Sequence, residues 1–527
     1  MKRGLANRFR SPRFVYRSQF IVVCHSAVKE KIMRFTQFNS RRRFATLASA
    51  LALGAAVSFA DISVLPSASA AENSTQTAQT AEKPGYAIIA SPQVLDDADW
   101  AKVVESLKTK RSEEFNVSII RRETDDAAFA ELREVFPKFA CFVVKPEEAT
   151  KANLATIWQK TRALDDDPYG DVIWGIITGY DADDALRMTQ VQDRPTTKVA
   201  AGTSIALCYF DEGIAYDELK KNLKRVKKPG EAPEITNDAP DDTTRALAES
   251  LDGAQLFVAS GHATQRNWMI GFSYRNGYFV SENGKLFGKP STGEEPFEIT
   301  ASGSKIYLAS GNCLIGDIDG KDAMALALIH SANVDQMVGY VVPTWFGYMG
   351  WGVQDYYIEQ PGRFTLAEAF FANNQALLSL LEEAEAENAT PSKLPKGAPL
   401  SARYVQGLEY DRDVVALYGD PAWRNALAEQ ESGWTQTLKS EKTEDGRTLW
   451  TFTVEPKKGD KSFELIDPNG SERGYRPFFQ FFPTRVADPQ IVSGAEFNPV
   501  VVDNFVLVPQ TEKTTPDKPI VIQVSTR

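Results

Sequence analysis

Between residues 85 and 200, short apolar runs alternate with segments of helical pattern, and this alternation constrains the fold more than any other feature. The apolar runs of strand length lie at 86–91, 116–120, 139–144 and 172–177. The helical patterns between them lie at 97–110, 126–136 and 149–164. Strands that alternate with helices at such short spacing predict βαβ units and a parallel sheet.

A second α/β set follows this segment. Its expected strands lie at 204–210, 255–262, 305–313 and 336–342, and its expected helices at 216–228, 242–251 and 322–330. Residues 269–302 carry Gly and Pro turns, which indicate an inserted antiparallel hairpin. Thr365 and Glu368 match the capping box that opens a helix, and this helix is predicted to run to about residue 386.

The patterns divide the 527-residue chain into five segments. Beyond about residue 430, alternating runs such as 448–454 and 519–524 predict an all-β sandwich. The predicted fold class is therefore α/β, with a parallel-sheet core in two α/β subdomains followed by a C-terminal all-β sandwich. The expected segments are a signal at 1–70, a polar linker at 71–84, subdomains at 85–200 and 201–428, and the sandwich at 429–527.

The first 70 residues have the character of an export signal. Three arginines at 41–43 precede an apolar stretch, as in twin-arginine or Sec signals, and residues 68–70 offer a small-x-small cleavage site. Met33 is a candidate start. Asp61 and Pro66 interrupt the apolar stretch before it reaches the roughly 20 residues that a transmembrane helix needs. We expect export to the periplasm, cell envelope or exterior, with no stable membrane span after signal removal.

The charge of the exported part argues against two classes of partner. Of the 59 Lys and Arg residues 12 lie in the first 70 positions, and of the 70 Asp and Glu residues 2 lie there. The remainder holds 47 basic and 68 acidic residues, a net charge of about −21. Nucleic acid and anionic membrane surfaces are poor partners for such a protein. The composition does not indicate an oligomeric state.

Three of the four cysteines lie beyond the expected signal: Cys141, Cys208 and Cys313. An odd number leaves at least one thiol unpaired within the chain. Cys141 and Cys208 lie inside apolar runs, and we expect both to pack as inert core residues in strands. Cys313 follows the end of its predicted strand and is the thiol placed to react.

His262 and Cys313 end two runs of similar sequence, Val-Ala-Ser-Gly-His and Leu-Ala-Ser-Gly-Asn-Cys. The carboxyl ends of parallel strands collect at one edge of an open α/β sheet, so we expect the imidazole and the thiol to meet there. A nearby imidazole raises the thiolate population, and small residues at strand ends leave backbone N–H groups free to bind an oxyanion. The alternative is that His262 is a satisfied loop histidine and Cys313 a buried thiol.

Several further motifs resemble the gingipain-type family of caspase-like cysteine peptidases. His262 precedes Cys313 by 51 residues, an interval close to that of caspases. The matching segments are Asp171-Val-Ile-Trp-Gly-Ile-Ile-Thr-Gly before an Ala-rich helix at 182–186, Ser260-Gly-His-Ala with Trp268, Met337-Val-Gly-Tyr-Val-Val followed by Thr344-Trp-Phe-Gly, and Leu417-Tyr-Gly-Asp-Pro. The resemblance covers residues 85 to about 425. It implies a caspase-like or gingipain-like core and cysteine-type peptidase activity on a peptide or protein substrate.

The resemblance also implies roles for individual residues. Cys313 would be the nucleophile, and His262 would carry the proton to the leaving amine. The backbone N–H groups of Cys313 and Ala263 would bind the oxyanion. Trp345 would form a wall of the pocket for the residue before the cut, with packing of a loop aromatic as the alternative. Asp317 would meet a basic substrate side chain or, as we expect from its position, cap the next helix.

Four positions depart from the family pattern. Ala263 stands where the family has Gly, and Asn312 stands where it has Ala before the nucleophile. Tyr180 stands after Gly179, and no Arg follows Gly175. A peptidase-like binding or scaffold protein without turnover is therefore the alternative function. No residue that would orient His262 can be identified, because the cluster upstream of it is expected to be a solvated acidic loop. That cluster consists of Asp165, Asp166, Asp167 and Asp171.

The sequence does not support a metal centre. Beyond the signal only His262 and His330 remain, with no His/Cys cluster at ligand spacing, which argues against a metal-dependent hydrolase. Residues 317–320 do not begin an EF-hand loop, because Asp322 stands at the invariant Gly position. No cofactor is required by the expected chemistry, and calcium binding by acidic loops stays open without support from spacing. His330 is expected to cap helix carbonyls or to pack.

Overall fold

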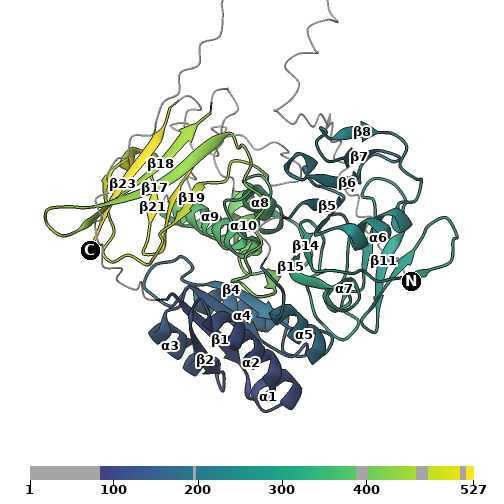
Figure 1. The fold of residues 1–527 in the computed structure, drawn as a ribbon, viewed down its shortest axis with the longest axis horizontal. Coiled ribbons are helices and arrows are strands. Elements are labelled where there is room, and N and C mark those ends of the chain that lie inside the picture. The colour runs from purple at the N-terminus through teal and green to yellow at the C-terminus, as the bar shows by residue number, and fades with distance from the viewer. Residues whose placement is uncertain (1–82, 194–196, 387–401, 458–472, 511–517) are drawn as a thin grey trace, which may run out of the picture. The chain divides into compact units, whose positions relative to one another are not determined.

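The N-terminal α/β segment follows the order of elements expected from its sequence, as the computed structural model shows (Figure 1). The structure describes residues 83–193, 197–386, 402–457, 473–510 and 518–527. The predicted signal and nearly all of the predicted linker lie outside these residues. Parallel ladders join four strands in the order β2-β1-β3-β4. Their bounds are β1 (Gly85–Ala90), β2 (Asn116–Arg121), β3 (Phe139–Val143) and β4 (Ile173–Ile177).

Short polar side chains begin the helices that connect these strands. The helices are α1 (Pro92–Leu95), α2 (Ala98–Ser112), α3 (Asp125–Val135), α4 (Lys151–Thr161) and, after β4, α5 (Ala182–Thr189). The N-cap side chains of Asp97, Thr124, Thr150 and Asp181 accept N–H groups of the first turn of α2, α3, α4 and α5. Each cap satisfies a donor that the helix itself cannot, so the sequence determines where these helices start.

The second half of the large sheet contains the two strands that precede His262 and Cys313. The strands β6, β5, β9, β14 and β15 are parallel neighbours in that order, and β7 and β8 extend the edge beyond β6 in antiparallel fashion. The bounds are β5 (Val199–Gly202), β6 (Glu212–Tyr216), β7 (Lys224–Lys227), β8 (Glu234–Thr236), β9 (Leu256–Ala259), β14 (Lys305–Ala309) and β15 (Val334–Tyr340). Helices α6 (Thr244–Gly253) and α7 (Met324–Ala332) lie close to the expected positions.

Two predicted elements of this half are wrong. Residues 204–210 were expected to be a strand, but the strand is β5, and the apolar run after it contains only the 3-10 turn η1 (Leu207–Tyr209). Cys208 therefore lies in a turn and is half-buried. The basic stretch at 216–228, expected to be a helix, is the β6–β7 hairpin, and Asn222 in its turn has a φ of +64°.

A single strand joins the two halves into one sheet of twelve strands. This strand, β16 (Val415–Tyr418), is parallel to β4 and antiparallel to β15. The strands of the two halves therefore run in opposite directions, and both predicted subdomains contribute strands to one continuous sheet. Strands β3, β4, β14 and β15 are buried along their whole length, as expected for a parallel sheet covered on both faces.

An antiparallel insertion and three further helices complete the α/β part. The insertion is a four-stranded sheet of β10 (Asn267–Met269), β11 (Tyr278–Glu282), β12 (Lys285–Lys289) and β13 (Phe297–Ile299), which agrees with the predicted hairpin. Helix α9 (Leu366–Ala386) begins with the predicted capping box, since Thr365 and Glu368 each accept the other's backbone N–H, at 3.3 and 3.0 Å. Helices α8 (Tyr348–Tyr357) and α10 (Ala402–Asp411) were not predicted.

The C-terminal part consists of two antiparallel sheets that share a core. One sheet has the order β17-β18-β23-β20 and the other β19-β22-β21. The bounds are β17 (Trp434–Lys442), β18 (Thr448–Pro456), β19 (Phe478–Phe481), β20 (Gln490–Ser493), β21 (Val500–Val501), β22 (Phe505–Val508) and β23 (Ile520–Thr526). Phe452 and Ile522 of the first sheet and Phe478 and Val506 of the second belong to one buried cluster. Phe479, on the opposite face of β19, belongs to the core of the α/β part.

Among the described residues, no helix combines the length and apolar character needed to cross a membrane.

Candidate functional site

His262 and Cys313 follow neighbouring parallel strands. In the ladder between β9 and β14, Ala259 pairs with Ala309, and both chains then leave the sheet at the same edge. His262 comes three residues after Ala259, and Cys313 comes four residues after Ala309. The segments that carry the two side chains therefore start side by side at a carboxyl edge, which is where binding and chemistry collect in open α/β sheets.

Two hydrogen bonds tie these segments together beyond the ladder. The N–H of Ser310 donates to the carbonyl of Ala259 at 3.1 Å. The side-chain amide Nδ2 of Asn312 donates to the carbonyl of Gly261 at 3.1 Å. Gly261 directly precedes His262, and its φ of +107° is a conformation that favours glycine. The Asn312–Gly261 hydrogen bond thus joins the residue before Cys313 to the residue before His262.

Cys313 is half-buried, and its sulfur contacts the loop after β15. The N–H of Thr344 donates to the sulfur at 3.2 Å. Leu314, the next residue, has a φ of +59°, which is uncommon for a side chain of this size. Its N–H donates to the carbonyl of Val342 at 3.1 Å. The chain therefore turns sharply at Cys313 and is held on the same loop that contacts the thiol.

Helix α8 supports the strand end before Cys313. Gln354 on this helix donates through Nε2 to the hydroxyl of Ser310 at 2.5 Å. A β-carbon at Gly311 would lie 2.9 Å from the Trp351 ring, so only glycine fits there without a shift. The next residue of α8, Asp355, is fully buried and forms an ion pair with Arg473 from the segment that precedes β19. The C-terminal part thus braces the helix behind the thiol.

The His262 ring is exposed and stacks on Phe272. The ring centroids are 4.8 Å apart with an interplanar angle of 27°, and the Phe272 side chain is itself 52% exposed. The carbonyl of His262 accepts the N–H of Met269 at 2.8 Å. Within the described part of the chain, no hydrogen bond joins the His262 and Cys313 side chains.

The two backbone N–H groups expected to bind an oxyanion have no hydrogen-bond partner among the described residues. Ala263 faces Trp268 in a single antiparallel bridge, in which Thr264 and Met269 donate the N–H groups. The N–H of Ala263 therefore points away from the bridge, as it does at every non-hydrogen-bonded position of an antiparallel pair. Ala263 does not have a positive φ, so its β-carbon introduces no backbone strain.

Glu218 is a residue of this site that the sequence analysis missed. Its carboxylate accepts hydrogen bonds from the hydroxyls of Ser204, at 2.5 Å, and Ser260. Burial raises the pKa of Glu218, and the two serine bonds oppose this shift. The Glu218 carbonyl accepts the N–H of Phe272 at 2.7 Å. Glu218 therefore contacts both the strand end before His262 and the loop that contains Phe272, whose ring stacks on His262.

The segment that contains Glu218 was expected to be helical, which is why it was missed. In a helix at 216–228 its carboxylate would have no reason to face the end of β9. The signal that could have located it is the turn chemistry between β6 and β7. Asp217 accepts the N–H groups of Leu219 and Lys220 at 2.9 and 2.8 Å, as Asp does in many turns.

Trp345 and Asp317, the two candidate pocket residues, each contact another side chain. Trp345 follows Thr344, is 46% exposed, and stacks on Tyr410 with centroids 5.8 Å apart. Asp317 is half-buried, and its carboxylate accepts the side-chain amide of Gln265 at 3.0 Å. The expectation that Asp317 caps the next helix is wrong, because α7 starts at Met324 after an N-cap, Ala323, that makes no side-chain bond.

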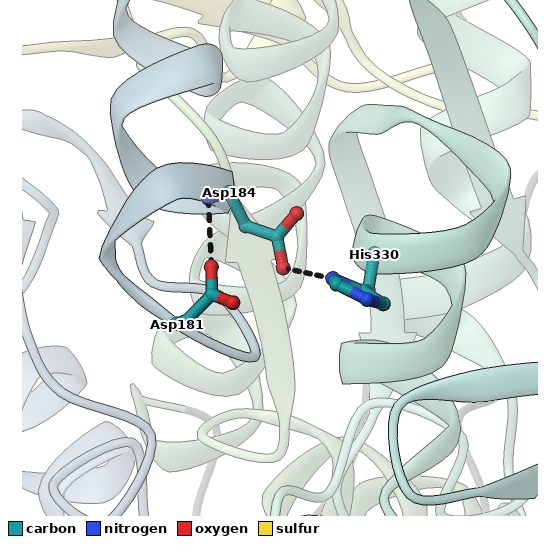
Figure 2. A group of neighbouring side chains, drawn as sticks. All are labelled: Asp181, Asp184 and His330. Atoms are coloured by element: carbon teal, nitrogen blue, oxygen red, sulfur yellow. Dashed lines mark hydrogen bonds and ion pairs between the residues drawn. The ribbon is translucent and has the colours of Figure 1, made fainter.

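One group with the composition of a metal site lies between α5 and α7 (Figure 2) and consists of Asp181, Asp184 and His330. His330 Nδ1 lies 2.9 Å from a carboxylate oxygen of Asp184, and the His330 ring packs against Tyr180. The carboxylate of Asp181 accepts the N–H of Asp184 as an N-cap. Packing of His330 is therefore confirmed, whereas its polar partner is a carboxylate rather than the expected helix carbonyls.

A second acidic group consists of Asp165, Asp171 and Asp503. Asp171 is buried, which corrects the expectation that it belongs to a solvated loop. Burial, followed by the charge of Asp165, raises the pKa of Asp171 to about 8. Asp503 forms an ion pair with Arg485 at 2.7 Å. The carboxylates of both acidic groups have structural partners, and we assign neither group to a metal.

Comparison of the chain with models of protein families, with curated proteins and with solved structures finds no match. The resemblance to gingipain-type peptidases therefore depends on the motifs of the chain itself.

Proposed function

We propose that this protein is an exported cysteine endopeptidase that hydrolyses peptide bonds through a His262/Cys313 dyad. The observation that carries the proposal is the position of both residues directly after neighbouring parallel strands, with the side chain of Asn312 linking the two segments. Export is inferred from the N-terminal sequence.

The proposed chemistry is acyl transfer. The Cys313 thiolate attacks the scissile carbonyl, and His262 gives the proton to the leaving amine. The N–H groups of Cys313 and Ala263 stabilise the oxyanion, as preorganised donors do in such sites. Water then hydrolyses the acyl-enzyme and regenerates the thiol. This sequence needs no metal ion for the chemical step.

The first test is the reactivity of the three described thiols. We expect iodoacetamide or a peptidyl electrophile to label Cys313 at least about tenfold faster than Cys141, because a reactive cysteine is a partly exposed thiolate and Cys141 is fully buried. Burial also raises the pKa of the Cys141 thiol. Cys208 is half-buried outside the site and is the matched comparison. Equal labelling of Cys208 and Cys313 in the folded protein would contradict the proposal.

The second test is hydrolysis of a peptide panel that differs in the residue before the cut. We expect Cys313→Ala to reduce kcat/KM by about 10³-fold or more, as removal of a catalytic nucleophile does. Cys208→Ala, the control, should retain the wild-type rate. His262→Ala should lose activity as well. If the wild-type protein hydrolyses none of the peptides, the result would support the alternative function without turnover.

The alternative is a binding or scaffold protein that keeps a peptidase-like fold without turnover. One observation favours it: the Cys313 sulfur contacts Thr344, the His262 ring contacts Phe272, and no hydrogen bond joins the two side chains in the described part of the chain. Catalytic pairs are often long in the absence of substrate, so we place this function second.

A further inference from the structure

Asn312 differs from the other polar residues around the dyad because it is fully buried and only half of its amide is satisfied. Its Nδ2 group donates to the carbonyl of Gly261 at 3.1 Å, as described above. Its Oδ1 atom is also buried, and the described residues provide no hydrogen-bond partner for it. A buried acceptor without a partner destabilises the folded protein. An alanine at this position would avoid that cost, so the Nδ2 contact is the feature that the asparagine adds.

The Nδ2 contact lies between the two segments whose separation sets the dyad. Gly261 comes directly before His262, and Asn312 comes directly before Cys313. The loops are linked again further on, where Gln265 donates to Asp317 at 3.0 Å. That second link lies on the far side of both candidate catalytic residues. Of the two hydrogen bonds on the sheet side, Ser310 to Ala259 and Asn312 to Gly261, the Asn312 contact is the one next to the dyad and the one made by a side chain.

We infer that Asn312 is a positioning residue, whose amide holds the His262 segment at the distance from Cys313 that proton transfer requires. The inference depends on the proposed function. A general base works only within hydrogen-bond reach of its proton, and a displacement of about 1 Å can reduce a rate by about 100-fold. Without the Asn312 donor, no side chain of the segment that carries Cys313 binds the Gly261 carbonyl. The loop that carries His262 then loses this link to Cys313.

The test compares Asn312→Ala and Asn312→Asp with the wild-type protein. Alanine removes both ends of the amide. Aspartate keeps two acceptors but has no donor for the Gly261 carbonyl, so it separates the role of Nδ2 from that of Oδ1. We expect both variants to lose about tenfold or more in kcat/KM.

The measurement that distinguishes positioning from general stability is the pH dependence of Cys313 alkylation by iodoacetamide. An imidazole partner keeps a thiolate reactive at pH values where a lone thiol, with a pKa near 8.5, is largely protonated. We expect wild-type labelling to continue at pH 6, and labelling of both variants at pH 6 to fall about tenfold while the rates converge at pH 9.

Asn425→Ala is the matched control. Asn425 is another fully buried asparagine, and its Nδ2 links two segments by donating to Gln336 at 2.6 Å, but it lies after β16 and does not contact the dyad segments. This variant should lose stability and keep the wild-type pH profile of labelling.

Two outcomes overturn the inference in distinguishable ways. If the wild-type profile persists in Asn312→Ala, or in Asn312→Asp, the amide donor does not position the dyad although the dyad is real. If wild-type Cys313 itself reacts as a lone thiol and no peptide is cleaved, the proposed function fails, and the role of Asn312 fails with it.

Discussion

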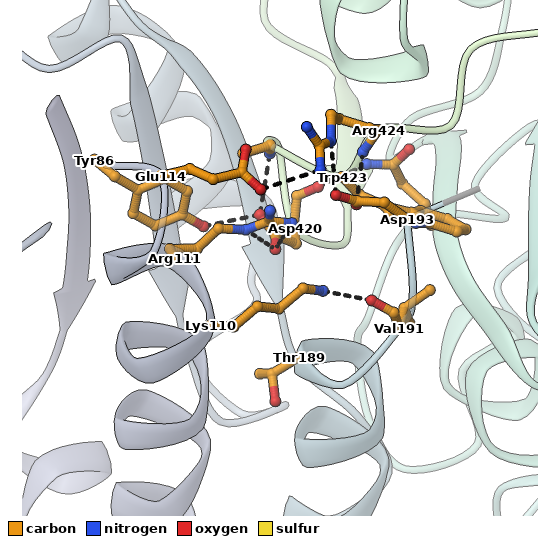
Figure 3. Close-up of polar contacts among 12 residues, drawn as sticks. Tyr86, Lys110, Arg111, Glu114, Thr189, Val191, Asp193, Asp420, Trp423 and Arg424 are labelled. Atoms are coloured by element: carbon orange, nitrogen blue, oxygen red, sulfur yellow. Dashed lines mark hydrogen bonds and ion pairs between the residues drawn. The ribbon is translucent and has the colours of Figure 1, made fainter. Parts of the chain in front are cut away.

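The two halves of the large sheet are built from similar βα units and both bury ion pairs, but only the second half places candidate reactive side chains at its strand ends. The first half, β1 to β4, contributes one side of such a buried pair. Arg111 on α2 is 2% exposed and binds Asp420, which also accepts the hydroxyl of Tyr86 at 2.9 Å (Figure 3). In the half formed by β5 to β15, the reactive side chains lie at open strand ends, where His262 is exposed and Cys313 is half-buried.

This difference indicates a division of labour within one sheet. The Arg111–Asp420 pair connects α2 to the turn after β16. This strand joins the two halves of the sheet. Such groups contribute to a specific arrangement but have no access to solvent or substrate. The strand ends of the second half contain small residues, a sharp turn at Cys313 and uncommitted backbone donors. We expect substitutions in the first half to change stability, and substitutions in the second half to change reactivity.

The largest expected effect is that of Arg111→Met. It would leave the Asp420 carboxylate buried without its charge partner, and breaking a buried pair in this way typically costs about 3–5 kcal/mol. The measurement is the free energy of unfolding from urea denaturation. Lys102→Met on the same helix is the control, because the Lys102–Asp99 pair is exposed and its loss should leave the urea midpoint unchanged.

The double variant Arg111→Met/Asp420→Asn should recover part of the lost stability, since it removes the unpaired charge. Labelling of Cys313 should be the same in all folded variants of this set. A large loss of Cys313 reactivity in folded Arg111→Met would show that the two halves are not independent.

The next effect concerns pH and the first half of the sheet. Burial raises the pKa of Asp171 to about 8 in the folded protein, whereas an unfolded aspartate titrates near 3.9. The folded state therefore holds a proton that the unfolded state releases, and the associated stability is complete below about pH 4 and is lost as the pH rises through about 8. We expect Asp171→Asn to remove this loss.

The check is the melting temperature of wild type and Asp171→Asn between pH 5 and 9. The melting temperature of Asp171→Asn should rise relative to that of the wild type as the pH increases, with the largest difference at pH 9. Asp166→Asn, at an exposed position of the same loop, should show no such trend. Parallel curves for Asp171→Asn and wild type would mean that the carboxyl is ionised in the folded protein at all these pH values.

The sequence predicted the first half of the sheet more accurately than the second, and the reason is physical. Each helix of the first half starts at a capping residue such as Asp97 or Thr124, and the strands β1, β3 and β4 are continuous apolar runs. In the second half, β5 has only four residues, and the apolar run after it, 204–210, satisfies the pattern of a strand without forming one. Periodicity cannot separate strand from non-strand in runs this short.

The candidate site could be predicted only in part for the same reason. His262 and Cys313 were found because each ends a clear apolar run, and the pairing of those runs follows from the parallel sheet. Glu218 and Phe272 come from the mispredicted hairpin and from the insertion, and their contacts depend on loop conformations that no local pattern specifies. The burial of Asp171 likewise depends on the tertiary contact with the C-terminal part, where Arg485 binds its carbonyl.

The smallest expected effect concerns the turn after the thiol. Leu314 adopts a φ of +59°, which costs a non-glycine residue on the order of 1–3 kcal/mol, and glycine adopts it without strain. Leu314→Gly also increases the conformational entropy of the unfolded chain, which lowers the free energy of unfolding by roughly 0.5–1 kcal/mol. The substitution removes a half-buried side chain as well, which is also destabilising. We expect the relief of strain and the two destabilising contributions to cancel to within about 1 kcal/mol in urea denaturation.

Reactivity is the sharper measurement at this position, because the local turn determines where the Cys313 sulfur lies. Leu314→Gly keeps the turn and should label at the wild-type rate. Leu314→Val introduces a β-branched side chain, for which a positive φ is a genuine outlier, and should shift the turn and slow Cys313 labelling severalfold. Such a loss in a variant that stays folded would locate the reactivity of the second half in its backbone turn. Equal labelling of the glycine and valine variants would instead place it in the side chains alone and weaken the contrast with the first half.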